Sequence, residues 1–244
     1  MKTFVITEIG SNWEGSVQKA EKIIKECKKA GADAVKFQMW RANDLYKKSH
    51  PNWDEISRSE LTFEKAEKIK KIAEKYNIEF FCSVFFPESV DFLESIGVKK
   101  FKVASRTCLQ KDPFSKETLR RLSKTKTKNF ISMGMGGNKN YMVKNFKNNP
   151  PVFFYCISEY PLEFNKIDWK IATKFDGFSD HTEGIIAPIL YTLFKKQNKS
   201  KIIYIEKHVK LKNSKGPDAS TSIDTEELSE LISNIRKIEK IKTT

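Results

Sequence analysis

The feature that most constrains this chain is a strand-then-helix unit that repeats along its whole length. Short apolar runs, such as residues 4–8, 34–38 and 201–206, are each followed by an amphipathic segment with helical periodicity. The units follow one another at spacings of roughly 22 to 32 residues, which indicates βα repetition and a parallel sheet. Eight units in 244 residues predict an α/β fold, a TIM (β/α)8 barrel, as a single domain covering residues 1–244. A doubly wound open sheet is the alternative, although no glycine-rich phosphate loop follows any run.

The element boundaries follow from where each apolar or amphipathic run stops. The predicted strands are residues 4–8, 34–38, 79–85, 100–105, 129–133, 152–156, 175–180 and 201–206. The predicted helices are residues 17–30, 63–76, a segment opened by Pro87, 116–123, 141–147, 169–174, 183–194 and 224–241, with Asp224 as N-cap. The stretch between the second strand and the second helix is expected to be a long polar loop.

The composition excludes several classes of protein. Hydrophobic residues make up 39% of the chain, enough for a core, and the longest apolar run is too short to span a membrane. The four cysteines lack Cys-x-x-Cys spacing and the N-terminus turns polar too early for a signal peptide, which indicates a reduced, cytoplasmic protein. The net charge of +14 comes almost entirely from lysines spread over helix faces, which argues against a nucleic-acid partner.

Two of the three histidines come at the ends of predicted strands. His181 follows the seventh strand, and His208 follows the eighth after Lys207. Parallel barrels build their active sites at these strand ends, and imidazole suits divalent transition metals. Each histidine alone is compatible with a simple strand cap. Together they predict a metal site that keeps open positions for substrate.

Two lysines lie inside predicted strands, where a charge is costly to bury. Lys36 and Lys102 alternate with apolar neighbours that face the helices, so both lysines should point to the barrel axis. Their ammonium groups are expected to meet near Ser105 and Ser179, in a pocket for phosphate and carboxylate groups. Further polar residues at the strand ends are Glu8, Gln38, Ser83, Ser132, Ser158, Tyr160 and Glu206.

Several stretches of the chain resemble the N-acetylneuraminate (sialic acid) synthase family. They are EIGSNWEG (8–15), GADAVKFQ (31–38), ESVDFLESIGVKKFKVAS (88–105), SMGM (132–135), SEYP (158–161), GFSDHTEGI (177–185), EKH (206–208) and GPD (216–218). The resemblance implies a TIM-barrel enzyme that condenses phosphoenolpyruvate with an N-acylated aldose, such as N-acetylmannosamine. The products are a sialic-acid-like nonulosonate and phosphate.

The resemblance also implies roles for residues of this chain. His181 and His208 match the ligands of a divalent ion, Mn²⁺ first and Mg²⁺ or Co²⁺ as alternatives. The positions that match phosphoenolpyruvate contacts are Lys36, Ser83, Lys102, Ser105, Ser132 and Ser179. The positions that match the sugar or the reacting centre are Glu8, Gln38, Tyr160, Glu206 and Asp218. We take Glu8, Glu206 and Lys102 as the candidate catalytic residues. The implied partners are the two small substrates, and the resemblance allows a homodimer.

The chain departs from the family pattern at several places. Asn12-Trp13 occupies the place of the family's Asn-His pair, and Ser105-Arg106-Thr107 occupies the place of Ser-Gly-Glu. Pro217-Asp218-Ala219 occupies the place of Pro-Asp-His. Positions for the metal and phosphoenolpyruvate are therefore retained, while several around the sugar are altered.

The chain also stops at Thr244, without the C-terminal antifreeze-like domain that family members add. That domain lends an arginine to the sugar site. Arg106 at the end of the fourth strand either replaces this donor at the mouth of the barrel or is a solvated loop residue, and the sequence favours the solvated residue. Three alternatives stay open: a metal-dependent phosphoenolpyruvate aldolase for a phosphorylated sugar, a degenerate barrel that only binds anionic ligands, and a lysine-rich protein that binds nucleic acid or anionic glycan.

Overall fold

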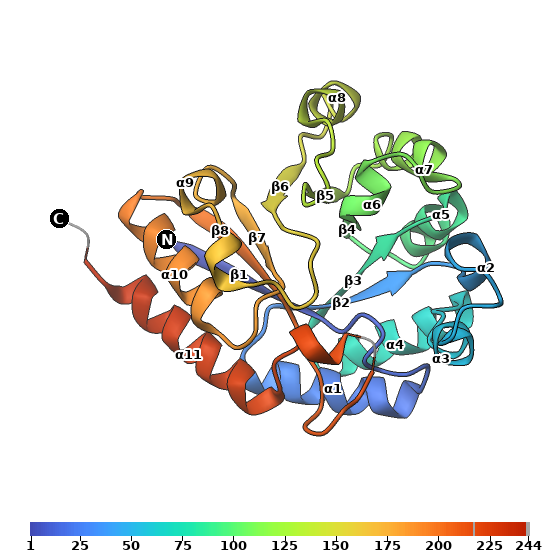
Figure 1. The fold of residues 1–244 in the computed structure, drawn as a ribbon, viewed down its shortest axis with the longest axis horizontal. Coiled ribbons are helices and arrows are strands. Elements are labelled where there is room, and N and C mark those ends of the chain that lie inside the picture. Colours follow the sequence, from blue (N-terminus) through green and yellow to red (C-terminus); the bar gives the residue numbers. More distant parts are fainter. Residues whose placement is uncertain (217, 243–244) are drawn as a thin grey trace.

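The computed structural model describes residues 1–216 and 218–242, and it contains a closed barrel of eight parallel strands in sequential order. The strands are β1 (Lys2–Glu8), β2 (Ala34–Met39), β3 (Glu79–Val84), β4 (Lys100–Val103), β5 (Lys128–Ser132), β6 (Val152–Tyr155), β7 (Gly177–Asp180) and β8 (Ile202–His208). Helices surround them in one domain (Figure 1). The prediction of a TIM barrel is confirmed, and the open-sheet alternative is wrong because β1 pairs with β8.

Each strand is followed by helical structure. The α-helices are α1 (Val17–Ala30), α2 (Ala42–Leu45), α3 (Trp53–Arg58), α4 (Phe63–Lys75), α5 (Pro87–Ser95), α6 (Ser105–Cys108), α7 (Ser115–Leu122), α8 (Lys139–Asn145), α9 (Trp169–Ala172), α10 (Ile186–Gln197) and α11 (Thr225–Lys240). Short 3-10 helices are η1 (Phe164–Lys166) and η2 (Ala219–Thr221). The prediction of Asp224 as N-cap of the last helix is confirmed, with a capping box to Glu227.

The sequence prediction differs from the structure most in two segments just after strands; in addition, β8 runs to His208, beyond its predicted end at residue 206. The expected polar loop after β2 contains α2 and α3, which pack Ala42 and Ile56 against Trp40 and Phe85. The fourth strand ends at Val103 rather than Ser105, because Ser105 begins the short helix α6. Both segments are too short to show helical periodicity in sequence, so tertiary packing decides their conformation.

Aromatic side chains fill the barrel interior on the side of the strand N-termini. Phe130 packs against Phe81, Phe154 and Tyr204 at ring separations of 5.0–5.7 Å. These rings fill the middle of the barrel, and the polar residues of the site gather nearer the carboxyl ends of the strands. Lys102 marks the border, since its ammonium lies 3.8 Å from the centre of the Phe154 ring.

Many of the lysines lie on solvent-exposed helix faces. Lys68 and Lys71 on α4 pair with the glutamates four residues before them, which is the spacing of neighbours on a solvated helix face. The four cysteines are free and buried. Among residues 1–216 and 218–242, no helix combines the length and apolar character needed to cross a bilayer.

Candidate active site

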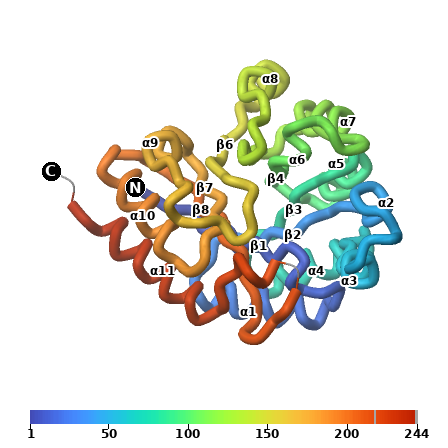
Figure 2. Tube along the Cα trace, in the orientation of Figure 1, coloured from blue at the N-terminus to red at the C-terminus, as the bar shows by residue number. Residues whose placement is uncertain are grey.

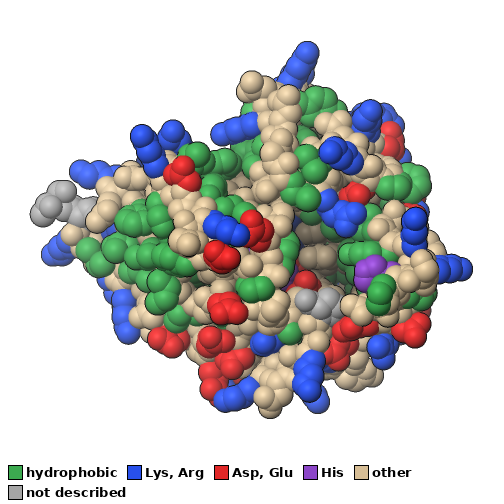
Figure 3. Space-filling model, in the orientation of Figure 1, with side chains coloured by type: hydrophobic (Ala, Val, Ile, Leu, Met, Phe, Trp, Pro, Cys, Tyr) green, Lys and Arg blue, Asp and Glu red, His purple; other side chains and the backbone are tan. Residues whose placement is uncertain are grey.

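A cavity of about 390 Å³ opens at the carboxyl ends of the strands. The space-filling view shows the molecule hollowed near the middle of the face (Figure 3). Every residue that the sequence placed at the site lines this cavity: Glu8, Lys36, Gln38, Ser83, Lys102, Ser105, Ser132, Tyr160, Ser179, His181, Glu206, His208 and Asp218. The structure therefore brings them together, as strand-end residues of one barrel must be.

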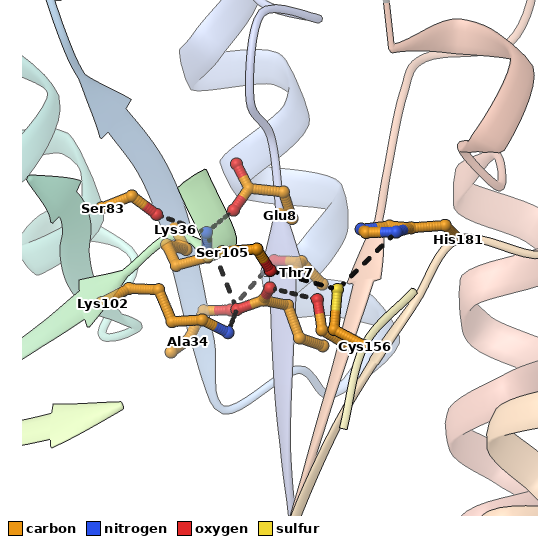
Figure 4. Close-up of polar contacts among 11 residues, drawn as sticks. Thr7, Glu8, Ala34, Lys36, Ser83, Lys102, Ser105, Cys156 and His181 are labelled. Carbon is orange, nitrogen blue, oxygen red and sulfur yellow. Dashed lines mark hydrogen bonds and ion pairs between the residues drawn. The ribbon is translucent and has the colours of Figure 1, made fainter. Parts of the chain in front are cut away.

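A buried charge cluster forms the floor of the cavity (Figure 4). Lys102 Nζ lies 2.8 Å from Glu206 Oε2, and Lys36 Nζ lies 3.6 Å from the same oxygen. Ser179 Oγ donates to Glu206 Oε1 at 2.7 Å. The two ammonium groups thus meet at Glu206 beside Ser179. Ser105, the other residue near which the ammonium groups were predicted to meet, lines the same cavity and accepts a hydrogen bond from the Gly134 amide.

The second carboxylate of the floor belongs to Glu8. It contacts the ammonium of Lys36, which also donates to Ser83 Oγ at 2.8 Å. Within the described part of the chain, neither Glu8 oxygen has a hydrogen-bond donor in acceptable geometry, although both are buried. Burying carboxylate oxygens that accept no hydrogen bond costs free energy. Glu8 is therefore suited to accept a proton, or a hydrogen bond from a ligand hydroxyl.

Burial shifts the pKa values of these groups. Burial lowers the pKa of Lys36 to about 8, and the neighbouring Lys102 cation acts in the same direction. For Glu206, burial opposes ionisation, but the ion pairs with Lys102 and Lys36 hold its pKa well below the ordinary value. These shifts keep Glu206 ionised at neutral pH and bring Lys36 closer to losing its charge than an ordinary lysine.

The two imidazoles stand side by side above this floor. The ring centres of His181 and His208 are 5.4 Å apart. Tyr160 covers both rings, at 4.1 Å from His181 and 6.1 Å from His208. Nδ1 of His181 lies 2.7 Å from the Ile157 carbonyl, which leaves Nε2 for a ligand.

The imidazoles fit a divalent ion that the family resemblance implies. Nδ1 of His208 is buried and has no hydrogen-bond partner in residues 1–216 and 218–242. Burial lowers the pKa of His208 to about 3, which keeps the ring neutral as a metal ligand must be. Over the same residues, no three His, Cys, Asp or Glu side chains are grouped as metal ligands.

Ser105 and Gly134 shape the side of the cavity below β5. A Cβ on Gly134 would come within 2.8–2.9 Å of Cys156 Sγ, Ser158 Oγ and Ser105 Oγ. Only glycine fits among them, and its amide donates to Ser105 Oγ at 3.0 Å. Cys156, interpreted from sequence as a small hydrophobe, lines the cavity beside His181, with Sγ 3.9 Å from Nδ1. The sequence feature that could have indicated this role is the position of Cys156 one residue after β6, at the carboxyl end of the strand.

The departures from the family pattern differ in their distance from the cavity. Trp13 is buried against Phe37 in the layer between barrel and helices, so its change does not touch the substrate side. Ala219 lies in η2 and is absent from the cavity lining. Arg106 does line the cavity, and Asp112 holds it through bonds of 2.7 Å to Nε and 2.8 Å to Nη2.

A clamp joins the loops that follow the first and last strands. Asp218 lines the cavity, and its Oδ2 accepts from the Ser11 amide at 2.9 Å and the Ser11 hydroxyl at 2.7 Å. Gly10 adopts φ +52°, where a side chain would collide with that oxygen. One oxygen of Asp218 is therefore used to position the loop. Pro217, in the same predicted motif, lies outside the described residues.

Sequence reasoning missed one side of the cavity. Trp40, Leu45, Tyr46, Phe85 and Met135 line it from the loops after β2, β3 and β5. Each comes at least one residue after a strand, where the alternation of strand faces gives no information. The signal that was present is the concentration of aromatic residues just past β2 and β3.

Comparison with known proteins identifies the relatives of this barrel. The sequence model of the NeuB family matches residues 23–244. The chain belongs to the NeuB family. The N,N'-diacetyllegionaminic acid synthase of Legionella pneumophila is 30% identical, over 99% of this chain and 73% of that protein. The N-acetylneuraminate-9-phosphate synthase of Homo sapiens is 26% identical, over 97% of this chain and 70% of that protein.

A solved structure agrees with this family assignment. The N-acetylneuraminic acid (sialic acid) synthetase of Leptospira borgpetersenii superposes with a TM-score of 0.87 and 25% identity, covering 98% of this chain and 85% of that one. The resemblance to N-acetylneuraminate synthases is thus confirmed. This NeuB-family protein is an enzyme similar to sugar-acid synthases.

Proposed function

We propose that this protein condenses phosphoenolpyruvate with an N-acylated aldose to give a sialic-acid-like nonulosonate and phosphate. One observation carries the proposal: two buried lysines meet a carboxylate at the floor of the same cavity in which two imidazoles stand 5.4 Å apart. Cations for a phosphorylated acid and ligands for a Lewis acid are the two requirements of this reaction. The named relatives are synthases of the same class of sugar acid.

Phosphoenolpyruvate would lie over the floor of the cavity. Lys36 and Lys102 supply charge, and incoming phosphate and carboxylate oxygens would share these ammonium groups with Glu8 and Glu206. The hydroxyls that line the same region would add neutral donors. They belong to Ser83, Ser105, Ser132 and Ser179.

His181 and His208 would hold the divalent ion, with Mn²⁺ proposed and Mg²⁺ or Co²⁺ as alternatives. When bound, such an ion polarises the aldehyde for attack. The Ile157 carbonyl fixes the ring of His181, and Tyr160 lies over both rings and limits the access of water.

The bond changes follow from the two substrates. The enol carbon of phosphoenolpyruvate attacks the aldehyde carbon, and a positive charge develops on the carbon that bears the phosphate. Water adds to that carbon and loses a proton, and a proton is returned to the former aldehyde oxygen, which becomes a hydroxyl. The second proton of the water leaves with phosphate as the C–O bond breaks and the new carbonyl forms. We assign acceptance of the water's proton to Glu8. Glu206 is the poorer base, because two lysines and a serine hydroxyl stabilise its ionised form. Lys102 would stabilise the departing phosphate.

The sugar would lie nearer the cavity mouth, where Gln38, Tyr160 and Asp218 line the wall. The rival aldolase for a phosphorylated sugar needs a spare cationic site for a second phosphate. Among the described residues lining the cavity, the lysines and Arg106 are all engaged by carboxylates. This arrangement favours an uncharged aldose.

The test is release of inorganic phosphate from phosphoenolpyruvate in the presence of N-acetylmannosamine and other N-acylated aldoses, with and without Mn²⁺, Mg²⁺ or Co²⁺. We expect aldose-dependent release and a product whose mass is that of the condensed sugar acid. Lys102→Ala serves as the matched inactive control. Binding of phosphoenolpyruvate without turnover of any aldose would instead support the degenerate, non-catalytic barrel.

We also propose a cytoplasmic enzyme with one barrel domain that forms a homodimer. The four free, buried cysteines support a reducing compartment. Light scattering on the purified protein tests the dimer, for which a monomeric mass at micromolar concentration would be the contrary result.

A further inference from the structure

A second cavity opens at the amino ends of strands β5 to β8. Because the eight strands are parallel, their starts lie at the opposite mouth of the barrel from His181 and His208. The volume of this cavity is about 290 Å³, and one water molecule occupies about 30 Å³ in the liquid, so a small molecule can enter. We call it the amino-end cavity, and its polar lining residues are Lys128, Asp176, Ser200, Lys201 and Tyr204.

Tyr204 lines the inner end of the amino-end cavity and is 3% exposed. Its ring packs against Phe4, Phe130 and Phe154 at ring separations of 5.0–6.2 Å, which fixes the position of its hydroxyl. The Lys128 ammonium donates a hydrogen bond to this hydroxyl and lies 4.8 Å from the ring centre. No residue among 1–216 and 218–242 accepts the hydroxyl proton in return. The phenol therefore has a donor left for a ligand.

Two equivalent lysines at this mouth of the barrel have different partners. Lys100 and Lys128 are register partners at the starts of β4 and β5. Lys100 contacts both carboxylate oxygens of Glu79, so its charge is balanced within the protein. Lys128 donates to the neutral Tyr204 hydroxyl, and it forms no ion pair within the described part of the chain. The Lys128 ammonium is therefore held in place and can still bind an anion.

The other polar groups of the amino-end cavity leave it positively charged. Lys201 is exposed and, like Lys128, forms no ion pair with any described residue. The carboxylate of Asp176 lies 3.5 Å from the Lys195 ammonium, which offsets its charge. Ser200 adds a further hydroxyl to the lining. Two ammonium groups and two hydroxyls thus surround the same space, and a ligand with several acceptor oxygens would use all of them.

From these observations we infer that the amino-end cavity is a second anion site, which binds a phosphate dianion as the free ion or as the end of a phosphate monoester. A phosphate group carries close to two negative charges at neutral pH, which matches the ammonium groups of Lys128 and Lys201. Its oxygens accept the hydrogen bonds that Tyr204 and the ammonium groups donate. The site is separate from the active site and does not depend on the proposed function.

The test is a titration of isotope-labelled protein with phenyl phosphate and, separately, with inorganic phosphate, followed in amide NMR spectra at neutral pH. The Ile202 amide reports on the amino-end cavity that Ile202 lines. The Gly134 amide, which donates to Ser105 Oγ at 3.0 Å, reports on the active site. We expect the Ile202 signal to shift and saturate with each probe. An Ile202 signal that neither probe shifts would overturn the inference.

Variants identify the groups that bind. Lys128→Gln should raise the Kd measured at Ile202 about tenfold, because a charge-assisted hydrogen bond is lost. Tyr204→Phe keeps the ring packing and should raise that Kd about fivefold, through the loss of one neutral donor. The matched control is Lys116→Gln, an exposed lysine in the first turn of α7 without an ion pair among the described residues, and it should leave the Kd unchanged. Equal Kd values in the Lys128 and Lys116 variants would overturn the assignment.

The choice of probes separates the two sources of phosphate. Tighter binding of phenyl phosphate supports a monoester, whose carbon group would pack on Val152 and Ile202 in the lining, whereas tighter binding of inorganic phosphate supports the free ion. Benzoate carries the same ring with a single charge and should bind more weakly than phenyl phosphate by about tenfold or more. Benzoate that binds at the Ile202 reporter as tightly as phenyl phosphate would overturn the assignment to a dianion.

Discussion

Two buried lysine clusters lie on opposite faces of the same strands, and they differ in how completely the protein satisfies them. Asp180 and Lys207 are 0% exposed, and Lys207 Nζ lies 2.7 Å from Asp180 Oδ2. The ammonium also contacts the Thr182 carbonyl, while Asp180 accepts from the Thr182 amide at 2.9 Å and hydroxyl at 3.1 Å. One residue earlier on each strand, the side chains point the other way, and Ser179 and Glu206 face the cavity.

The cavity-facing cluster is satisfied only in part. Apart from its contact with the Lys36 ammonium, Glu8 has no hydrogen-bond donor among the described residues, and burial lowers the pKa of Lys36. The outer pair therefore needs nothing further, whereas the inner cluster gains stability when a ligand supplies the missing partners. Adjacent residues of β7 and β8 thus perform different tasks. The outer pair sits directly before His208 and beside His181, so it also fixes the strand ends that carry the imidazoles.

The largest effect is expected from breaking the outer pair. Lys207→Met leaves Asp180 buried without its cation and should lower the free energy of unfolding by roughly 3–5 kcal/mol. Denaturant unfolding measures this loss. The control, Lys36→Met, should cost less, because Lys102 and Ser179 still hold Glu206 when Lys36 is removed. The double variant Asp180→Leu with Lys207→Met should recover much of the lost free energy of unfolding. Equal losses in the Lys207 and Lys36 variants would contradict the difference between the outer pair and the inner cluster.

Removing a cation from the inner cluster should affect binding more than folding. Lys102→Ala is expected to weaken phosphoenolpyruvate binding by roughly 1.5–3 kcal/mol, the scale of a charge-assisted hydrogen bond. Titration calorimetry provides the measurement. Unchanged affinity would show that the ammonium does not contact the anion.

The pH dependence of binding follows from Lys36. Its pKa of about 8 means that the ammonium is charged at pH 7 and loses its charge as the pH rises through 8. Affinity for phosphoenolpyruvate should therefore fall above pH 8, earlier than an ordinary lysine near 10.4 would cause. Lys36→Arg should remove this change, since a guanidinium stays charged. A flat profile to pH 9.5 in the unmodified protein would contradict the assignment.

The smallest expected effect concerns Arg106. Because Asp112 already uses Nε and Nη2, the guanidinium can offer only Nη1 to a sugar. Arg106→Ala should raise the KM for the aldose several-fold, about 1 kcal/mol, with phosphoenolpyruvate binding unchanged. Kinetics equal to those of the unmodified protein would show that Arg106 does not replace the expected arginine.

The sequence predicted the barrel and the polar strand ends because both depend on alternation. Lys36 and Gln38 face the axis while Phe37 faces Trp13, as a two-residue period requires. What the sequence did not reveal depends on contacts between loops. Asp112 holds Arg106 from an irregular segment six residues further along the chain, and Ser11 meets Asp218 only because barrel closure brings β1 beside β8.

The contacts between the first strand and the last helix have a consequence for chain connectivity. The Thr3 amide donates to Glu239 Oε1 at 2.5 Å, and Arg236 Nη1 donates to the Thr3 carbonyl at 2.9 Å. The start of β1 and the helix α11 are thus neighbours in space (Figure 2). A short linker joining them, with new termini cut at the turn of Asn77 before β3, would give a circular permutant. The cavity lies at the other end of the barrel, so the permuted protein should keep the same active-site residues in the same arrangement.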